Sequence, residues 1–145
     1  MFTINMGILT ISYSFSLRMI FLTLCFLGII NRLFKIKYRY NDLKPLENIT
    51  SLCIIFGSYA AKKEKPNDID ILFVIKKSDY KKYSEALENI KRILPLKLHD
   101  VIQTKEDLTK KIKKEEKLII EAISEGIILW GHEFLIEAIK NAIKK

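Results

Sequence analysis

The chain has 145 residues, of which 49% are apolar, and it contains only five glycines and three prolines. This length suits one compact domain with a short extension, because domains cluster at roughly 100–150 residues. The apolar share supplies a core, which excludes a wholly disordered or collagen-like chain. With 25 basic and 17 acidic residues, the formal net charge is +8.

That charge is concentrated near the start of the chain. No acidic residue precedes Asp42, so residues 1–41 carry +5 and residues 42–145 carry +3. A basic arm of this kind favours contact with nucleic acid or an anionic surface. Cys25 and Cys53 lie in apolar runs, with no second Cys or His at metal-ligand spacing. We interpret them as buried thiols, which fits a reducing, cytoplasmic compartment.

Residues 7–30 are apolar enough to raise the question of a membrane segment or a signal peptide. The uninterrupted apolar run, residues 19–30, is shorter than the roughly 20 residues that a bilayer span needs. Arg18 interrupts any longer window, and no small-residue cleavage pattern follows. We therefore expect no membrane anchor, and we keep one as the less favoured alternative.

The first 45 residues are predicted to form an extension that precedes the main domain, 46–145. An apolar helix would end near Gly28, and residues 31–41 alternate basic and apolar side chains, which predicts a strand. A helix that ends at a glycine and is followed by a basic strand resembles the last helix and wing of a winged-helix DNA-binding module. Residues 1–16 are too few for the two preceding helices, so such a module would be truncated. A packing helix with an edge strand is an equally favoured interpretation.

The rest of the chain alternates strands and helices after a polar linker at 42–50. This order predicts an α/β fold with a small mixed sheet and flanking helices. Thr104 and Asp107 resemble a capping box at the start of the second long helix. The expected strands are 52–56, 69–75, 96–102 and the brief 127–130, and the expected helices are 80–94, 104–126 and 133–143.

The residues with the clearest chemical meaning lie between 54 and 75. A buried strand ends in Gly57 and Ser58, and Asp68 and Asp70 open the next buried strand. Alternation puts both carboxylates on one face of that strand. Two hard oxygen ligands on one face can hold Mg²⁺ together with phosphate oxygens. Gly57 lets the backbone approach a phosphate, and the amides of the following turn favour an anion.

This constellation resembles the signature of the DNA polymerase β-like nucleotidyltransferase superfamily. The motif is Gly57-Ser58, nine further residues, then Asp68-Ile69-Asp70, between hydrophobic strands. The nearest resemblance is to the minimal, MntA-type nucleotidyltransferases, over about residues 51–131. Those usually have ten intervening residues, and an Arg-Gly that is here Ala61-Lys62. Lys62 would contact phosphate, although a Lys-rich loop in a Lys-rich chain is more simply a solvated surface.

The resemblance implies a third carboxylate from a later strand, and Asp100 matches it by position. Asp68, Asp70 and Asp100 would then hold two Mg²⁺ ions, and Asp100 would help to deprotonate the acceptor hydroxyl. In the family, many members are antitoxins paired with a HEPN-domain toxin, and some transfer AMP from ATP to a tyrosine of that toxin. The resemblance thus implies a protein adenylyltransferase. The alternative is a non-catalytic antitoxin-like or nucleic-acid-associated module that keeps the fold.

Two other residues receive structural interpretations. His99 has the opposite strand parity to Asp100, so we expect it to be structural. Trp130 matches an aromatic residue often seen near the end of this family's domain, and we expect it to pack in the core.

Overall fold

A computed structural model describes residues 2–6, 9–13, 17–61 and 66–144. It divides into two compact units, residues 1–39 and 40–145. The first unit contains an antiparallel hairpin of β1 (Phe2–Met6) and β2 (Leu9–Tyr13), followed by most of helix α1 (Leu17–Leu43). Among the described residues, no helix is long and apolar enough to cross a membrane.

The strand predicted for residues 31–41 is wrong, because this segment belongs to helix α1. Gly28 does not end the helix either, since α1 continues for another 15 residues to Leu43. Ile36, Tyr40 and Leu43 are less exposed than the residues around them apart from Arg39, which is also partly buried. Their spacing of four and three is helical rather than alternating. The basic side chains that suggested a wing are therefore distributed around a helix.

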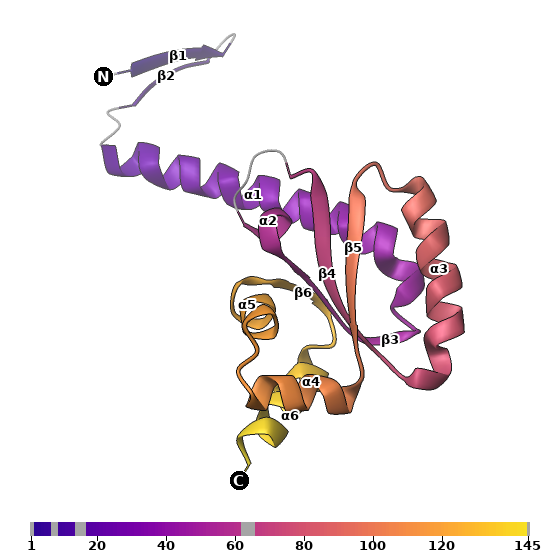
Figure 1. The fold of residues 1–145 in the computed structure, drawn as a ribbon. Coiled ribbons are helices and arrows are strands. Elements are labelled where there is room, and N and C mark those ends of the chain that lie inside the picture. The colour runs from indigo at the N-terminus through magenta and orange to yellow at the C-terminus, as the bar shows by residue number, and fades with distance from the viewer. Residues whose placement is uncertain (1, 7–8, 14–16, 62–65, 145) are drawn as a thin grey trace. The chain divides into compact units, whose positions relative to one another are not determined.

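The second unit contains a four-stranded sheet in the order β5-β4-β3-β6. Strand β3 pairs antiparallel with β4 and with β6, whereas β4 and β5 are parallel and connected through α3 (Figure 1). The mixed α/β sheet expected from the sequence is confirmed. Its elements are η1 (Lys44–Leu46), β3 (Thr50–Phe56), α2 (Gly57–Ala60), β4 (Asp68–Ile75), η2 (Lys77–Asp79), α3 (Tyr80–Ile93), β5 (Lys97–Gln103), α4 (Lys105–Lys113), α5 (Lys117–Glu125), β6 (Ile127–Trp130) and α6 (His132–Ile143).

Strand β4 separates two hydrophobic cores. Ile69, Ile71 and Phe73 face one core together with Tyr83 of α3. Leu72 and Val74 face the other core, which α4, α5 and α6 cover. From Ile71 onward every residue of β4 is buried, as in a central strand covered on both faces. Only Asp68 and Asp70, near the start of the strand, are partly open to solvent, so the two acids lie where the strand enters the core.

The segment predicted to be a linker, residues 42–50, is part of the core. Leu43 and Leu46 are 1% and 0% exposed. The hydroxyl of Thr50 donates to the Leu46 carbonyl at 2.9 Å and accepts from the indole N–H of Trp130 at 2.9 Å. Proline and polar residues suggested a free connection, but the two leucines between them are buried. The packing role expected for Trp130 is confirmed by this bond and by its ring contact with Phe73.

The single helix predicted for residues 104–126 is instead two helices, α4 and α5. Residues 113–117 are all charged and give the chain no apolar side chain to bury there. Glu115 adopts a left-handed backbone conformation, with φ of 53°, and the chain turns. The predicted cap at the start of α4 is confirmed, because the Asp107 amide donates to the Thr104 hydroxyl at 3.2 Å.

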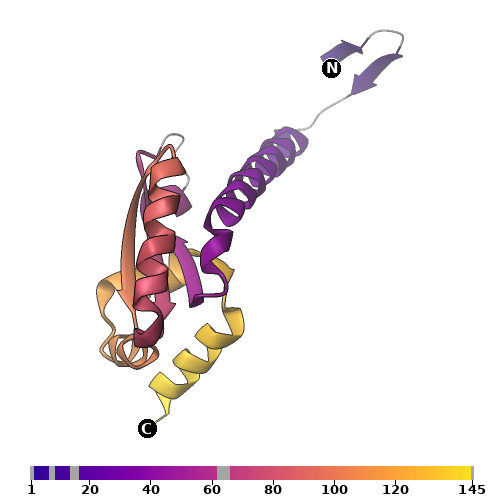
Figure 2. The same ribbon diagram turned by 90° about the vertical axis from the view of Figure 1, so that its right-hand side faces the viewer.

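Cys53 lies in the middle of β3 and is a fully buried free thiol, as predicted. Burial raises the pKa of this thiol above its usual range, because the low-polarity core disfavours a thiolate. Cys25 lies in α1, where its side chain is outside the described residues. Figure 2 gives the same ribbon turned by 90°, and in this view α6, drawn in yellow, lies below the sheet and leads to the C-terminus.

Candidate active site

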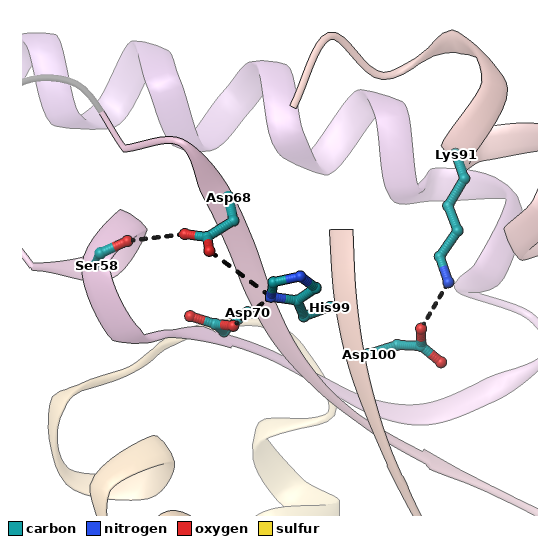
Figure 3. A network of polar contacts seen from close by, with 6 residues as sticks. All are labelled: Ser58, Asp68, Asp70, Lys91, His99 and Asp100. Atoms are coloured by element: carbon teal, nitrogen blue, oxygen red, sulfur yellow. Dashed lines mark hydrogen bonds and ion pairs between the residues drawn. The ribbon is translucent and has the colours of Figure 1, made fainter. Parts of the chain in front are cut away.

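The motif residues meet where β3 ends and β4 begins. Strand β3 runs directly into the four-residue helix α2, which opens with Gly57 and Ser58. Phe56 pairs with Asp70 across the two strands, so α2 starts beside the first residues of β4. The hydroxyl of Ser58 lies 3.3 Å from Oδ1 of Asp68 and donates to it (Figure 3). The fold therefore brings together Gly57, Ser58, Asp68 and Asp70, as their spacing predicted.

Gly57 is needed at this position for two reasons. Its φ of +65° is a left-handed conformation that side chains disfavour. A Cβ atom there would also lie 2.4 Å from Oδ2 of Asp70, so the carboxylate would have to move. The absence of a side chain thus lets the Asp70 carboxylate lie directly against the backbone at the start of α2.

His99 is a residue of this site that the sequence did not indicate. In the parallel pairing of β4 with β5, Asp70 is the partner of His99, so their side chains share a face. Nδ1 of His99 lies 3.4 Å from Oδ1 of Asp70 and 3.7 Å from Oδ2 of Asp68. Figure 3 shows the imidazole directed toward both carboxylates. Only the register between the two strands could have revealed this neighbour.

Asp100 does not join the other two acids in this structure. It pairs with Ile71, on the opposite face of the sheet from Asp68 and Asp70. There its two oxygens accept hydrogen bonds from Nζ of Lys91 at 2.9 Å and from the hydroxyl of Tyr83 at 3.1 Å. Burial, followed by the Asp100 charge, raises the pKa of Tyr83 above its usual range. Asp100 is thus bound to α3 rather than placed beside the metal-ligand candidates.

The last predicted contact, Lys62, lies outside the described residues, as do Lys63 and Lys65. Among the described residues, no group of three or more acidic, His or Cys side chains is arranged to hold a metal ion. The Asp68 and Asp70 side chains are 37% and 30% exposed. Two accessible carboxylates nevertheless fit Mg²⁺ in one respect, because this ion commonly uses one or two carboxylates and completes its shell with water and substrate phosphates.

A small mixed sheet whose Gly-Ser turn lies against two acids of the next strand defines a nucleotidyltransferase-type domain. Residues 41–125, more than half of the chain, match the family described as Polymerase beta, Nucleotidyltransferase. The chain belongs to this family, and the prediction made from the motif is confirmed. The matched region contains every described residue of the candidate site and ends before β6 and α6.

Two solved structures share a more distant likeness. One is a crystal structure of a mutant of the toxin–antitoxin MntA–HpeT, with a TM-score of 0.47 and 14% identity over 74% of this chain and 83% of that chain. The other is a toxin–antitoxin with AMP-PNP, with a TM-score of 0.45 and 17% identity over 78% of this chain and 82% of that chain. No curated protein matches the chain.

Proposed function

We propose that the chain is a Mg²⁺-dependent nucleotidyltransferase that transfers AMP from ATP to a hydroxyl group of a partner protein. The observation that carries the proposal is the contact of Gly57 and Ser58 with Asp70 and Asp68 at one end of the sheet. Membership of the nucleotidyltransferase family supports the type of reaction. The choice of ATP and of a protein acceptor rests on the resemblance of the motif to the minimal nucleotidyltransferases.

In this proposal Asp68 and Asp70 hold the metal, and Gly57 and Ser58 hold the nucleotide phosphates. Bound Mg²⁺ would supply charge neutralisation for the phosphates. The Ser58 hydroxyl can reorient toward a phosphate oxygen, because its bond to Asp68 is long at 3.3 Å. Since Gly57 has no side chain, a phosphate can approach its backbone closely.

The reaction forms one phosphorus–oxygen bond and breaks another, and it moves one proton. The acceptor oxygen attacks the α-phosphorus of ATP, and the bond from that phosphorus to the β-phosphate oxygen breaks as pyrophosphate leaves. The hydroxyl proton passes to a carboxylate oxygen of the Asp68 and Asp70 pair. We give Asp100 no role in this step, because both of its oxygens are bound on the other face. This differs from the third-ligand role that the sequence resemblance implied.

The partner that we propose is a HEPN-type toxin, with cytoplasmic ATP as the donor. The test is to incubate the full chain with α-³²P-labelled ATP, Mg²⁺ and such a partner, and to measure label on the partner. We expect Asp68→Asn/Asp70→Asn to lower transfer by at least about 100-fold, because even indirect metal contacts cost 10–100-fold. Glu85→Gln/Glu88→Gln, on the exposed face of α3, is the matched control and should keep full activity.

A second candidate is a binding module that neutralises its partner by contact alone. It is favoured by the place of Asp100, whose carboxylate is bound to Lys91 and Tyr83 on the opposite face from Asp68 and Asp70. If the wild-type chain binds the partner but no label is transferred, the binding module is the correct function. Equal transfer by Asp68→Asn/Asp70→Asn and by the control would contradict both the proposed mechanism and its metal ligands.

A further inference from the structure

A cavity of about 580 Å³ lies in the second unit, away from the candidate active site. It is formed where β4 ends, where α4 begins and beside α6. This volume falls within the range of small-molecule sites. Figure 1 shows that β4 and β5 both run from the side of α2 toward α4, so the cavity lies at the other end of the strands.

Lysines from two separate segments line this cavity. Lys76 and Lys77 follow β4, and Lys105 and Lys110 belong to α4. Lys105 forms an ion pair with Glu137 at 2.9 Å. Lys76, Lys77 and Lys110 have no ion-pair partner in the described part of the chain. Three ammonium groups without an ion-pair partner in the described part of the chain thus line one cavity.

This arrangement differs from the ordinary solvated lysines of the chain. Lys81 and Lys82, for example, are neighbouring exposed residues of α3 and do not line this cavity. The cavity lysines instead come together from positions about 30 residues apart in the sequence. A hollow lined mainly by one sign of charge concentrates the electrostatic field and attracts the opposite charge. Glu106 and Asp107 also line it, so the four lysines exceed the two acids by two charges, and by one when Lys105 is counted as paired with Glu137.

The rest of the lining is suited to an organic group rather than to an inorganic ion alone. Phe134 supplies partly exposed apolar surface beside the buried Val74 and Ile75, and Ser51 and Thr104 supply hydroxyl groups. The Thr104 hydroxyl donates to the Asp107 carboxylate at 2.8 Å, and this bond keeps the carboxylate at the N-terminus of α4. A ligand with a flat apolar part and a phosphate group would satisfy both kinds of surface.

We propose that this cavity binds a nucleoside phosphate, at a site separate from the candidate active site. The phosphate would contact the unpaired lysines, and the base would lie beside Phe134, whose ring also has Nζ of Lys105 at 5.8 Å from its centroid. Asp70 and Lys76 are six residues apart along an extended strand, on the order of 20 Å at about 3.3 Å per residue. The two sites therefore do not share a ligand. The site is independent of the proposed transfer reaction.

The experiment measures binding of ATP to the full chain by titration calorimetry in EDTA, at 0.15 M salt. Chelation removes the metal that the candidate active site would use. We expect one ATP per chain, and a loss of at least about tenfold in affinity in Lys76→Gln/Lys77→Gln, because two charge-assisted contacts are removed. Lys81→Gln/Lys82→Gln has the same change in net charge and should bind within twofold of the wild type.

Three other probes decide the chemistry of the ligand. Adenosine should bind at least about tenfold more weakly than ATP, since it lacks the phosphates, and inorganic phosphate should also be weaker. Equal affinity for ATP in the two lysine variants would overturn the proposal, as would no binding at millimolar ATP. Phosphate equal to ATP would overturn the role of the base. A single-stranded oligonucleotide that binds tenfold tighter than ATP at these lysines would assign the surface to nucleic acid instead.

Discussion

The carboxylates on the two faces of the sheet differ in their contacts and in their exposure to solvent. On one face both oxygens of Asp100 are bound, at 2.9 and 3.1 Å, and its side chain is 16% exposed. On the other face Asp68 and Asp70 have contacts of 3.3 to 3.7 Å and are about twice as exposed. A carboxylate with both oxygens satisfied stabilises the fold, whereas one with long contacts keeps oxygens available for a ligand. Position in the register, not residue type, separates the two cases.

The variant Asp100→Asn is the strongest test of this comparison. We expect the free energy of unfolding to fall by roughly 2 kcal/mol, because the variant loses a charge-assisted bond with Lys91 and weakens the bond from Tyr83. Urea denaturation measures this change, with Glu88→Gln as the control. Transfer should stay within about threefold of the wild type. A variant that is as stable as the wild type but inactive would restore Asp100 to the catalytic group.

The variant Gly57→Ala should affect the other face of the sheet, which carries Asp68 and Asp70. The new Cβ would be in a left-handed conformation and would displace the Asp70 carboxylate, so we expect a loss of roughly 1–2 kcal/mol in stability. Mn²⁺ affinity should fall as well, since Asp70 is one of the two ligands that we propose. Thermal unfolding and a Mn²⁺ titration measure the two effects. Unchanged Mn²⁺ binding would show that the contact between Gly57 and Asp70 has no functional meaning.

The free energy of unfolding at alkaline pH tests the face of the sheet that carries Asp100, because Tyr83 donates to that carboxylate. Its pKa is raised in the folded chain, so above pH 10 the unfolded chain loses a proton that the folded chain keeps. This stability is fully present below pH 10 and declines above it, by about 1.4 kcal/mol per pH unit for one group. In Tyr83→Phe the decline between pH 10 and 11 should be smaller by roughly 1 kcal/mol, because the unfolded tyrosine is only half ionised at pH 10. Urea denaturation at both pH values measures it, and equal declines would contradict the assignment.

The smallest expected change is the effect of Asp68→Asn on stability. Its contacts are long and partly exposed, so the free energy of unfolding should change by no more than about 0.5 kcal/mol. The measurement is again urea denaturation, beside Asp100→Asn. If Asp68→Asn destabilises the chain as much as Asp100→Asn does, the difference between the two faces disappears.

Much of the second unit could be predicted from alternation and motif spacing. The strands, α3 and the meeting of Gly57, Ser58, Asp68 and Asp70 all followed from local patterns. The opposite parity of His99 and Asp100 was also readable. Which of them faces the acid pair was not, because that depends on the pairing of Asp70 with His99 across strands joined by a whole helix.

The first unit was predicted less well. Residues 31–41 combine alternating basic and apolar side chains with a helical spacing of the less exposed ones, and the alternation was the misleading signal. At the start of the second unit, the buried state of Leu43 and Leu46 could not be read from a polar segment either, because it arises from packing against distant strands. Local periodicity therefore fails where the partners of a segment lie far away in the sequence.

The place of β3 in the sheet has a consequence for synthesis on the ribosome. Its two neighbours are β4, which follows closely, and β6, whose Trp130 bonds to Thr50 across 80 residues. Until residues 127–130 emerge, one edge of an almost wholly apolar strand has no partner. Open apolar edges pair readily with other chains. The nascent domain is thus most prone to aggregation just before its last strand is added, and a fragment cut at residue 125 would keep that exposed edge permanently.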